Sequence, residues 1–218
     1  MRPLLTTLEL LVAAVVGVVS AHGLDPLSVV IQTELGWPYG YMGRLEDADA
    51  QFRRALEMDP DYAMAHFDRG WMLLLRGEYA RAISALQRAA ELDPVSPFIP
   101  AWLGRTFAEA GRVEEARAIA ADFRERAEQG EDTCLFLAFI LEALGDEDAA
   151  FEFLERALER HEGGMWLLGI DNLLSFSPEF RAHPRFVAVL SEMGLPAEGP
   201  LEPNGSGDTP FLDARSFQ

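Results

Sequence analysis

Lysine is absent from this sequence of 218 residues, and all 18 of its basic residues are arginine. The chain carries 36 acidic residues, which gives a formal net charge of −18 at pH 7. Nucleic acids and anionic membrane surfaces bind proteins through clustered cations. The charge balance therefore argues against both as partners.

Cysteine occurs once, at Cys134, which excludes an internal disulfide and a cysteine-rich metal site. The four histidines do not have the spacing of metal ligands, and the chain contains neither a phosphate-binding glycine loop with its lysine nor a nucleophile elbow. We therefore predict no catalytic residue, no metal ligand and no cofactor, and expect a protein that is not an enzyme.

A short pattern recurs at a fixed interval through most of the chain. Asp-Pro dipeptides begin at Asp25, Asp59 and Asp93, each 34 positions after the previous one. Two sets of small residues keep the same interval: Gly43, Gly77, Gly111 and Gly145, and Ala48, Ala82, Ala116 and Ala150. Self-similarity at a fixed period of this length predicts an array of stacked structural units.

Each unit has the pattern of a helical hairpin, which is clearest in the second unit. Residues 63–77 carry apolar side chains at helical spacing and end in Arg76 and Gly77, a typical helix C-terminus. Residues 79–91 form one amphipathic face, and Pro94 prevents the helix from continuing.

The units resemble the tetratricopeptide repeat, a helix–turn–helix of about 34 residues. The segments that carry the resemblance include WLGRTFAEAGRVEEA (102–116) and FLAFILEALGDEDAAFEFLERAL (136–158). The resemblance implies an all-α superhelix, or solenoid, of about four units over residues 27–161. We expect helices at 29–42, 45–57, 63–76, 79–91, 97–110, 113–127, 132–144 and 147–160. Pro38 should kink the first of them, and Arg69 stands where the repeat usually has leucine.

The regions on either side of the repeats have different patterns. Residues 1–26 are an apolar segment that fits either the second helix of a truncated repeat or a signal peptide ending at Ala21. Residues 162–196 are predicted to form capping helices, with one helix in GGMWLLGIDNLL, another beginning at Ser177 and a last one ending at Gly194. Residues 197–218 have the composition of a disordered tail.

The resemblance also implies a binding surface, because the first helices of such repeats line a concave groove. The side chains predicted to line it are Trp37, Tyr41, Phe67, Trp71, Leu74, Arg105 and Phe139. A neighbouring helix is expected to cover Phe67 and Phe139, whereas Trp37, Trp71 and Arg105 are predicted to contact a partner. The partner should then offer apolar anchors, a carboxylate facing Arg105 and basic flanks that the acidic surface attracts.

We therefore interpret the chain as a non-enzymatic scaffold or adaptor for protein–protein interaction. The alternative is a stand-alone regulatory fragment of a larger signalling protein, since the ending resembles the repeat regions of some bacterial adenylate cyclases and winged-helix regulators. No stable membrane span is expected, because the uninterrupted apolar run at 10–19 is shorter than the roughly 20 residues required. We expect a cytoplasmic protein, or an exported or periplasmic one if residues 1–21 are a signal peptide.

Overall fold

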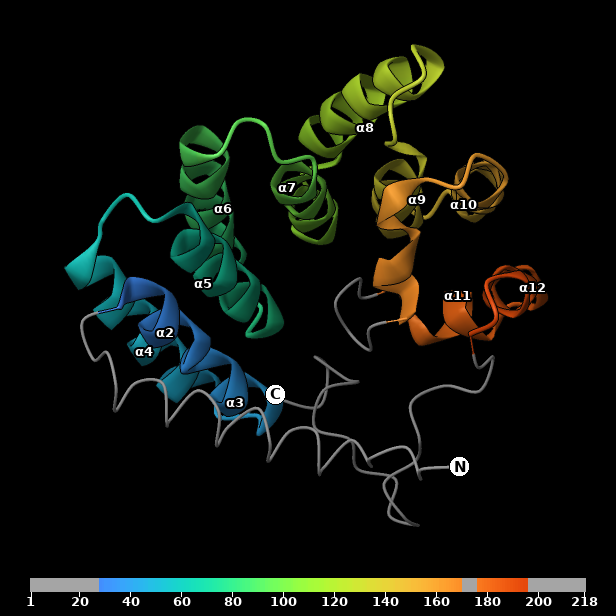
Figure 1. Cartoon of the computed structure of the whole chain (residues 1–218). Coiled ribbons are helices and arrows are strands. Elements are labelled where there is room, and N and C mark those ends of the chain that lie inside the picture. The colour runs from blue at the N-terminus through green and yellow to red at the C-terminus, as the bar shows by residue number, and fades with distance from the viewer. Residues whose placement is uncertain (1–27, 170–175, 196–218) are drawn as a thin grey trace, which may run out of the picture. The chain divides into compact units, whose positions relative to one another are not determined.

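A computed structural model describes residues 28–169 and 176–195. These residues form helices and contain no β-strand, which confirms the predicted all-α class of helical repeats (Figure 1). They divide into two compact units between Pro94 and Val95. The predictions for residues 1–26 and for the tail at 197–218 lie outside the described residues.

The first unit holds the first two repeats. Its helices are α2 (Val29–Glu34), α3 (Gly36–Tyr41), α4 (Leu45–Met58), α5 (Ala63–Leu75) and α6 (Tyr79–Leu92). Helices α2 and α3 pack on α4, α4 packs on α5, and α5 packs on α6. Helices α2 and α3 occupy the range in which the sequence predicts one kinked helix, and the interruption falls at Leu35. Pro38 has no N–H to donate to the carbonyl of Glu34, which explains why the α-helical pattern breaks there.

The second unit holds the other two repeats and the short helices that follow them. Its elements are α7 (Phe98–Glu109), α8 (Val113–Glu128), α9 (Cys134–Ala143), α10 (Glu147–Glu159), the 3-10 helix η1 (Gly163–Gly169), α11 (Pro178–Ala182) and α12 (Pro184–Glu192). The Ser177 side chain accepts a hydrogen bond from the amide of Phe180, as predicted for an N-cap. One prediction differs: residues 163–169 form a 3-10 helix, consistent with the low α-helix propensity of its first two glycines.

The predicted helix ends of the repeats are confirmed to within one or two residues. Gly77 ends α5 in the left-handed region, at φ 70°, where its amide donates to the carbonyl of Leu74 at 2.8 Å. The next amide, of Glu78, donates to the carbonyl of Leu73 at 2.9 Å. These two bonds pair carbonyls that the end of a helix leaves open, and glycine adopts the required conformation without steric cost.

Small residues set the distance between the helices of each hairpin. A Cβ atom on Gly70 of α5 would lie 2.7 Å from Cγ of Leu86 on α6, and one on Gly36 would overlap the Phe52 ring. On the second helices, Ala48 and Ala82 are completely buried. The sequence prediction that these positions permit close helix packing is therefore confirmed for both repeats of the first unit.

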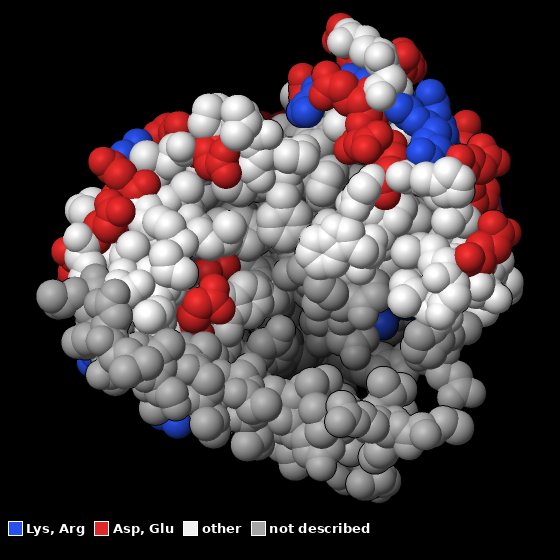
Figure 2. Space-filling model, viewed as in Figure 1, with Lys and Arg blue, Asp and Glu red and all other residues white. Residues whose placement is uncertain are grey.

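Among the charged side chains on the face that Figure 2 shows, acidic ones predominate. Asp and Glu side chains are spread over both units on this face, and basic side chains are fewer there. This distribution agrees with the net charge of −18.

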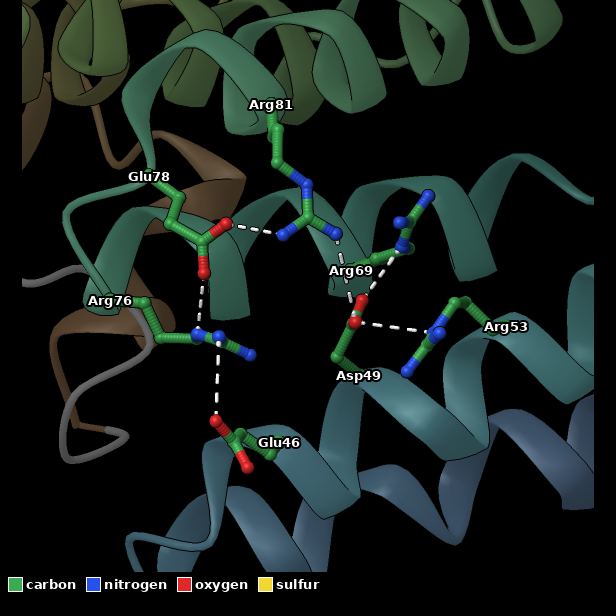
Figure 3. A network of polar contacts seen from close by, with 7 residues as sticks. All are labelled: Glu46, Asp49, Arg53, Arg69, Arg76, Glu78 and Arg81. Atoms are coloured by element: carbon green, nitrogen blue, oxygen red, sulfur yellow. Dashed lines mark hydrogen bonds and ion pairs between the residues drawn. The ribbon is translucent and has the colours of Figure 1, made fainter.

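An ion-pair network joins α4, α5 and α6 in the first unit (Figure 3). Its centre is Asp49, which is 3% exposed and accepts a hydrogen bond from Nε of Arg69 at 2.7 Å. Arg53 lies 3.2 Å and Arg81 3.8 Å from the same carboxylate. Arg81 also pairs with Glu78, which lies 2.7 Å from Arg76. Arg69, which replaces the usual leucine, is therefore explained by a buried carboxylate on the preceding helix.

We predict that Ala82→Leu destabilises the protein by about 1–3 kcal/mol, because the added methyl groups have no space between α5 and α6. Ala80→Leu, on the exposed face of the same helix, should change the free energy of unfolding by no more than about 0.5 kcal/mol. Urea denaturation followed by circular dichroism measures both. Equal effects would contradict the assignment of the buried face of α6.

A double-mutant cycle tests the Arg69–Asp49 pair. Arg69→Leu and Asp49→Ala should each destabilise the first unit, because each leaves a charge with fewer partners. The double variant should be more stable than the sum of the single effects predicts, by about 1–3 kcal/mol of coupling. Additive effects would mean that the pair contributes no interaction energy of its own.

Candidate functional site

The structure buries most of the side chains that the sequence analysis predicts to line the binding groove. In the first unit Trp71 is 1% exposed, Phe67 and Leu74 are buried as well, and Trp37 is half-buried. The side chain of Tyr41 lies outside the described residues. Coverage was expected for Phe67, but the burial of Trp71 differs from the sequence expectation. The preceding repeat contributes to it, because the rings of Trp37 and Trp71 lie with their centroids 4.7 Å apart.

Arg105, in the second unit, already has partners within the protein. It is 7% exposed, and its guanidinium lies 2.6 Å from Glu142 and 2.8 Å from Glu109. It also lies 4.6 Å from the centroid of the Phe139 ring, a cation–π contact. The prediction that Arg105 faces a carboxylate of a partner is therefore at odds with this geometry. Phe139 is buried, as expected for a residue covered by its neighbours. That the predicted groove residues bind a partner stays a prediction.

The first unit also contains a buried acidic side chain next to tryptophan, which the sequence analysis did not predict. Asp68 of α5 is completely buried, and its Oδ2 accepts a hydrogen bond from Nε1 of Trp37 at 3.3 Å. Its other oxygen, Oδ1, has no hydrogen-bond partner among the described residues. Glu34, at the end of α2, lies close enough to act on the carboxyl group of Asp68. We call the set of Glu34, Trp37, Asp68 and Trp71 the acid–tryptophan site.

Electrostatics set this site apart from the network around Asp49. Burial, and then the negative charge of Glu34, raise the pKa of Asp68 well above its usual range, while the hydrogen bond from Trp37 acts in the opposite direction. Burial also raises the pKa of Glu34. Among the described residues no arginine forms an ion pair with Asp68, whereas three arginines surround the almost equally buried Asp49. The acid–tryptophan site thus contains a buried acid whose ionised form has no cationic partner among the described residues.

A short phrase in the sequence could have revealed the site. Residues 34–37 read ELGW and residues 68–71 read DRGW, 34 positions later. In the next two repeats the same places read WLGR and FLAF, without an acid. Because stacked repeats bring equivalent positions together, the two acids and the two tryptophans become neighbours.

Cys134 is buried at the start of α9 in the second unit, next to the carboxylate of Glu162. Its amide donates to Oε1 of Glu162 at 3.1 Å, and the amide of Leu135 donates to Oε2 at 3.2 Å, so the buried carboxylate pairs the open N-terminus of α9. Burial, followed by the nearby Glu162, raises the pKa of the thiol to about 11. A thiol with a raised pKa and no exposed surface is a poor nucleophile.

Over residues 28–169 and 176–195, no three His, Cys, Asp or Glu side chains are placed to hold a metal ion. None of the helices formed by these residues has the length and apolar character needed to span a membrane.

Comparison with known proteins identifies the repeats. Three models of the tetratricopeptide repeat match residues 33–97, 73–132 and 131–161. Lipopolysaccharide assembly protein B of Escherichia coli strain K12 is 30% identical over 122 residues. That alignment covers 54% of this chain and only 30% of the length of the relative.

Solved structures share the fold at low sequence identity. MamA is 23% identical with a TM-score of 0.50, covering 71% of this chain and 91% of that one. A chain of the Cut9–Hcn1 hetero-tetramer of the APC/C is 17% identical with a TM-score of 0.57, covering 83% of this chain and 33% of that one. A tetratricopeptide repeat protein from Parabacteroides merdae is 16% identical with a TM-score of 0.52, covering 84% and 67%. The three family matches together extend from residue 33 to residue 161, and the chain belongs to the tetratricopeptide repeat family.

Proposed function

We propose that the protein is a non-enzymatic scaffold that binds a segment of another protein along the first helices of its repeats. The observation that carries the proposal is the run of repeats over residues 33–161. Repeat arrays of this kind expose extended surfaces that suit polypeptide partners.

The chemistry of the partner is inferred from the surface. Met64, on the first helix of the second repeat, is 40% exposed, so it can contact an apolar anchor of the partner. The net charge of −18 attracts basic segments and repels acidic ones. We therefore propose a partner segment with apolar anchors and basic flanks. Arg105 is paired with Glu142 and Glu109, so the proposal includes no carboxylate of the partner at that residue.

The relatives extend this proposal only as far as the repeats. The similarity to the lipopolysaccharide assembly protein spans less than a third of that protein, so we transfer the repeat-type interaction and leave its assembly role aside. A cytoplasmic location stays a prediction, because the possible signal peptide at residues 1–21 lies outside the described residues.

Affinity capture tests the function. The full chain, immobilised and incubated with extract of its native host, should retain a protein whose binding weakens as salt screens the acidic surface. Met64→Gln should weaken binding of that protein by about fivefold, the effect of losing roughly 1 kcal/mol of apolar contact. Met58→Gln is the matched control, because Met58 has nearly the same exposure, 39%, but lies on the second helix α4.

Two results would contradict the proposal. Recovery of no protein above the level of a blank matrix would argue against a scaffold. A captured protein that binds the Met64 and Met58 variants equally well would move the binding surface away from the first helices.

A further inference from the structure

We propose that the acid–tryptophan site of the first unit binds an arginine side chain of the partner segment. The proposal rests on the scaffold function above and specifies the side chain that one part of the surface recognises. Four residues form the site, namely Glu34, Trp37, Asp68 and Trp71, and all of them lie within one compact unit.

Asp68 is a buried acid whose charge the described residues leave uncompensated. A buried carboxylate normally has a cation or several hydrogen-bond donors as partners, because burying an uncompensated charge costs free energy. Asp68 is completely buried, has one donor at 3.3 Å on Oδ2, and has none among the described residues on Oδ1. In the same unit Asp49 has three arginines around it. The fold can therefore supply cations to a buried aspartate, yet this part of the chain supplies none to Asp68.

The local field around Asp68 is negative. Glu34 acts on Asp68 from the equivalent position of the preceding repeat, and both of them act on Tyr62 together with Asp59. Among the described residues no arginine forms an ion pair with Glu34 or Asp68, so a positive group that enters here is attracted by both carboxyl groups. A neutral or acidic side chain would gain nothing comparable.

The aromatic residues of the site favour arginine over lysine. A guanidinium has a planar fork of several donors, which matches the geometry of a carboxylate, and its flat face stacks on aromatic rings. The half-buried ring of Trp37, whose indole N–H donates to Asp68, is the aromatic surface that such a guanidinium would meet. A lysine ammonium is a single compact charge and would use less of this surface.

Two residues of the site reach the protein surface. Glu34 is exposed and Trp37 is half-buried, whereas Asp68 and Trp71 are buried, so a partner side chain would meet Glu34 and Trp37 first. The indole N–H of Trp37 is the donor on Asp68, at a distance slightly beyond the usual range for a strong N–H···O bond. An arriving guanidinium can replace this weak bond with a charged one. Exposed Met64 lies one helical turn before Asp68 on α5, where it can hold an apolar residue next to the arginine.

Peptide binding tests the proposal. The probe is a fluorescein-labelled, acetylated Gly-Leu-Arg-Leu-Gly peptide, titrated with the full chain and followed by fluorescence anisotropy. Asp68→Asn should weaken binding by about tenfold to a hundredfold, the factor expected for one lost charged hydrogen bond. Citrulline in place of arginine, which keeps the shape and removes the charge, should weaken binding similarly, and lysine should bind less tightly than arginine. Glu57→Gln, which removes an exposed carboxylate from α4, should leave the affinity unchanged.

Each other outcome overturns the proposal in a distinct way. Equal binding of the arginine and citrulline peptides, or equal binding by the parent and Asp68→Asn, excludes an arginine site. The scaffold function would still stand if a captured protein binds the Met64 variant more weakly than the Met58 variant. A dimer of the parent that Asp68→Asn dissociates in gel filtration would assign the cation to a second copy of this chain. Peptide binding that appears only after Arg2→Ala or Arg215→Ala would assign it to the chain's own basic residues.

The same variant gives a prediction for stability against pH. Burial first, and then the charge of Glu34, raise the pKa of Asp68 in the folded protein. In the unfolded chain this carboxyl has its ordinary pKa of ~4, so it loses its proton at a lower pH there than in the folded state. The stability of the parent should therefore fall as pH rises above ~4 toward the raised pKa. Asn stays neutral, so Asp68→Asn should melt at a higher temperature than the parent at pH 7, with a difference that shrinks toward pH 4.

The groups that bear on this titration are Glu34 and Trp37, which act on Asp68 directly, and Tyr62, on which Asp68 and Asp59 act in turn. Differential scanning fluorimetry at pH 4, 5, 6 and 7 measures the effect, with Glu57→Gln as the control for loss of one negative charge. A melting difference for Asp68→Asn that is constant with pH would contradict an unpaired buried carboxyl. Because arginine binds the ionised form, affinity for the peptide should rise over the same pH range.

Discussion

The close approach of two helices at small residues is the constraint from which the other features follow. Gly70 lies against Leu86 and Ala82 is completely buried, so α5 and α6 can pack only at this distance and in this register. The interval of 34 positions continues without insertion, so the two repeats within a unit meet at equivalent positions. For this reason Trp37 lies on Trp71, and the field of Glu34 reaches Asp68. A change of register would separate both pairs at once.

The elements that sequence could predict are those determined locally. Gly77 ends α5 because a left-handed residue closes the helix, and Ser177 begins α11 because its hydroxyl pairs an open amide. Pro38 interrupts the first helix because proline cannot donate a hydrogen bond. Each of these effects depends on a few neighbouring residues, so the sequence alone contains the necessary information.

The side-chain environment of the candidate site depended on residues that are distant in sequence. Arg105 was predicted to contact a partner, but Glu142 lies 37 positions later, one repeat plus one helical turn, and pairs with it. Trp71 was predicted to be open, but the tryptophan at the equivalent place in the preceding repeat lies against it. Helical periodicity tells which face a side chain occupies, and it does not tell which residue of the neighbouring repeat lies on that face. Pairs at 34 or 37 positions carry that information in this chain.

The buried charges divide according to how the protein compensates them. Asp49 is compensated by three arginines, Glu162 by two amides at the start of α9, and Arg105 by two glutamates. All of these groups stabilise contacts between helices. Asp68 has one weak donor and a carboxyl neighbour of the same sign, so its charged form opposes folding. Leucine or asparagine would avoid this cost at the same place, and the third and fourth repeats do carry Trp102 and Phe136 there. A local feature that lowers stability is best explained by function. Because Asp68 has no cationic partner among the described residues, we infer that its cation comes from a binding partner.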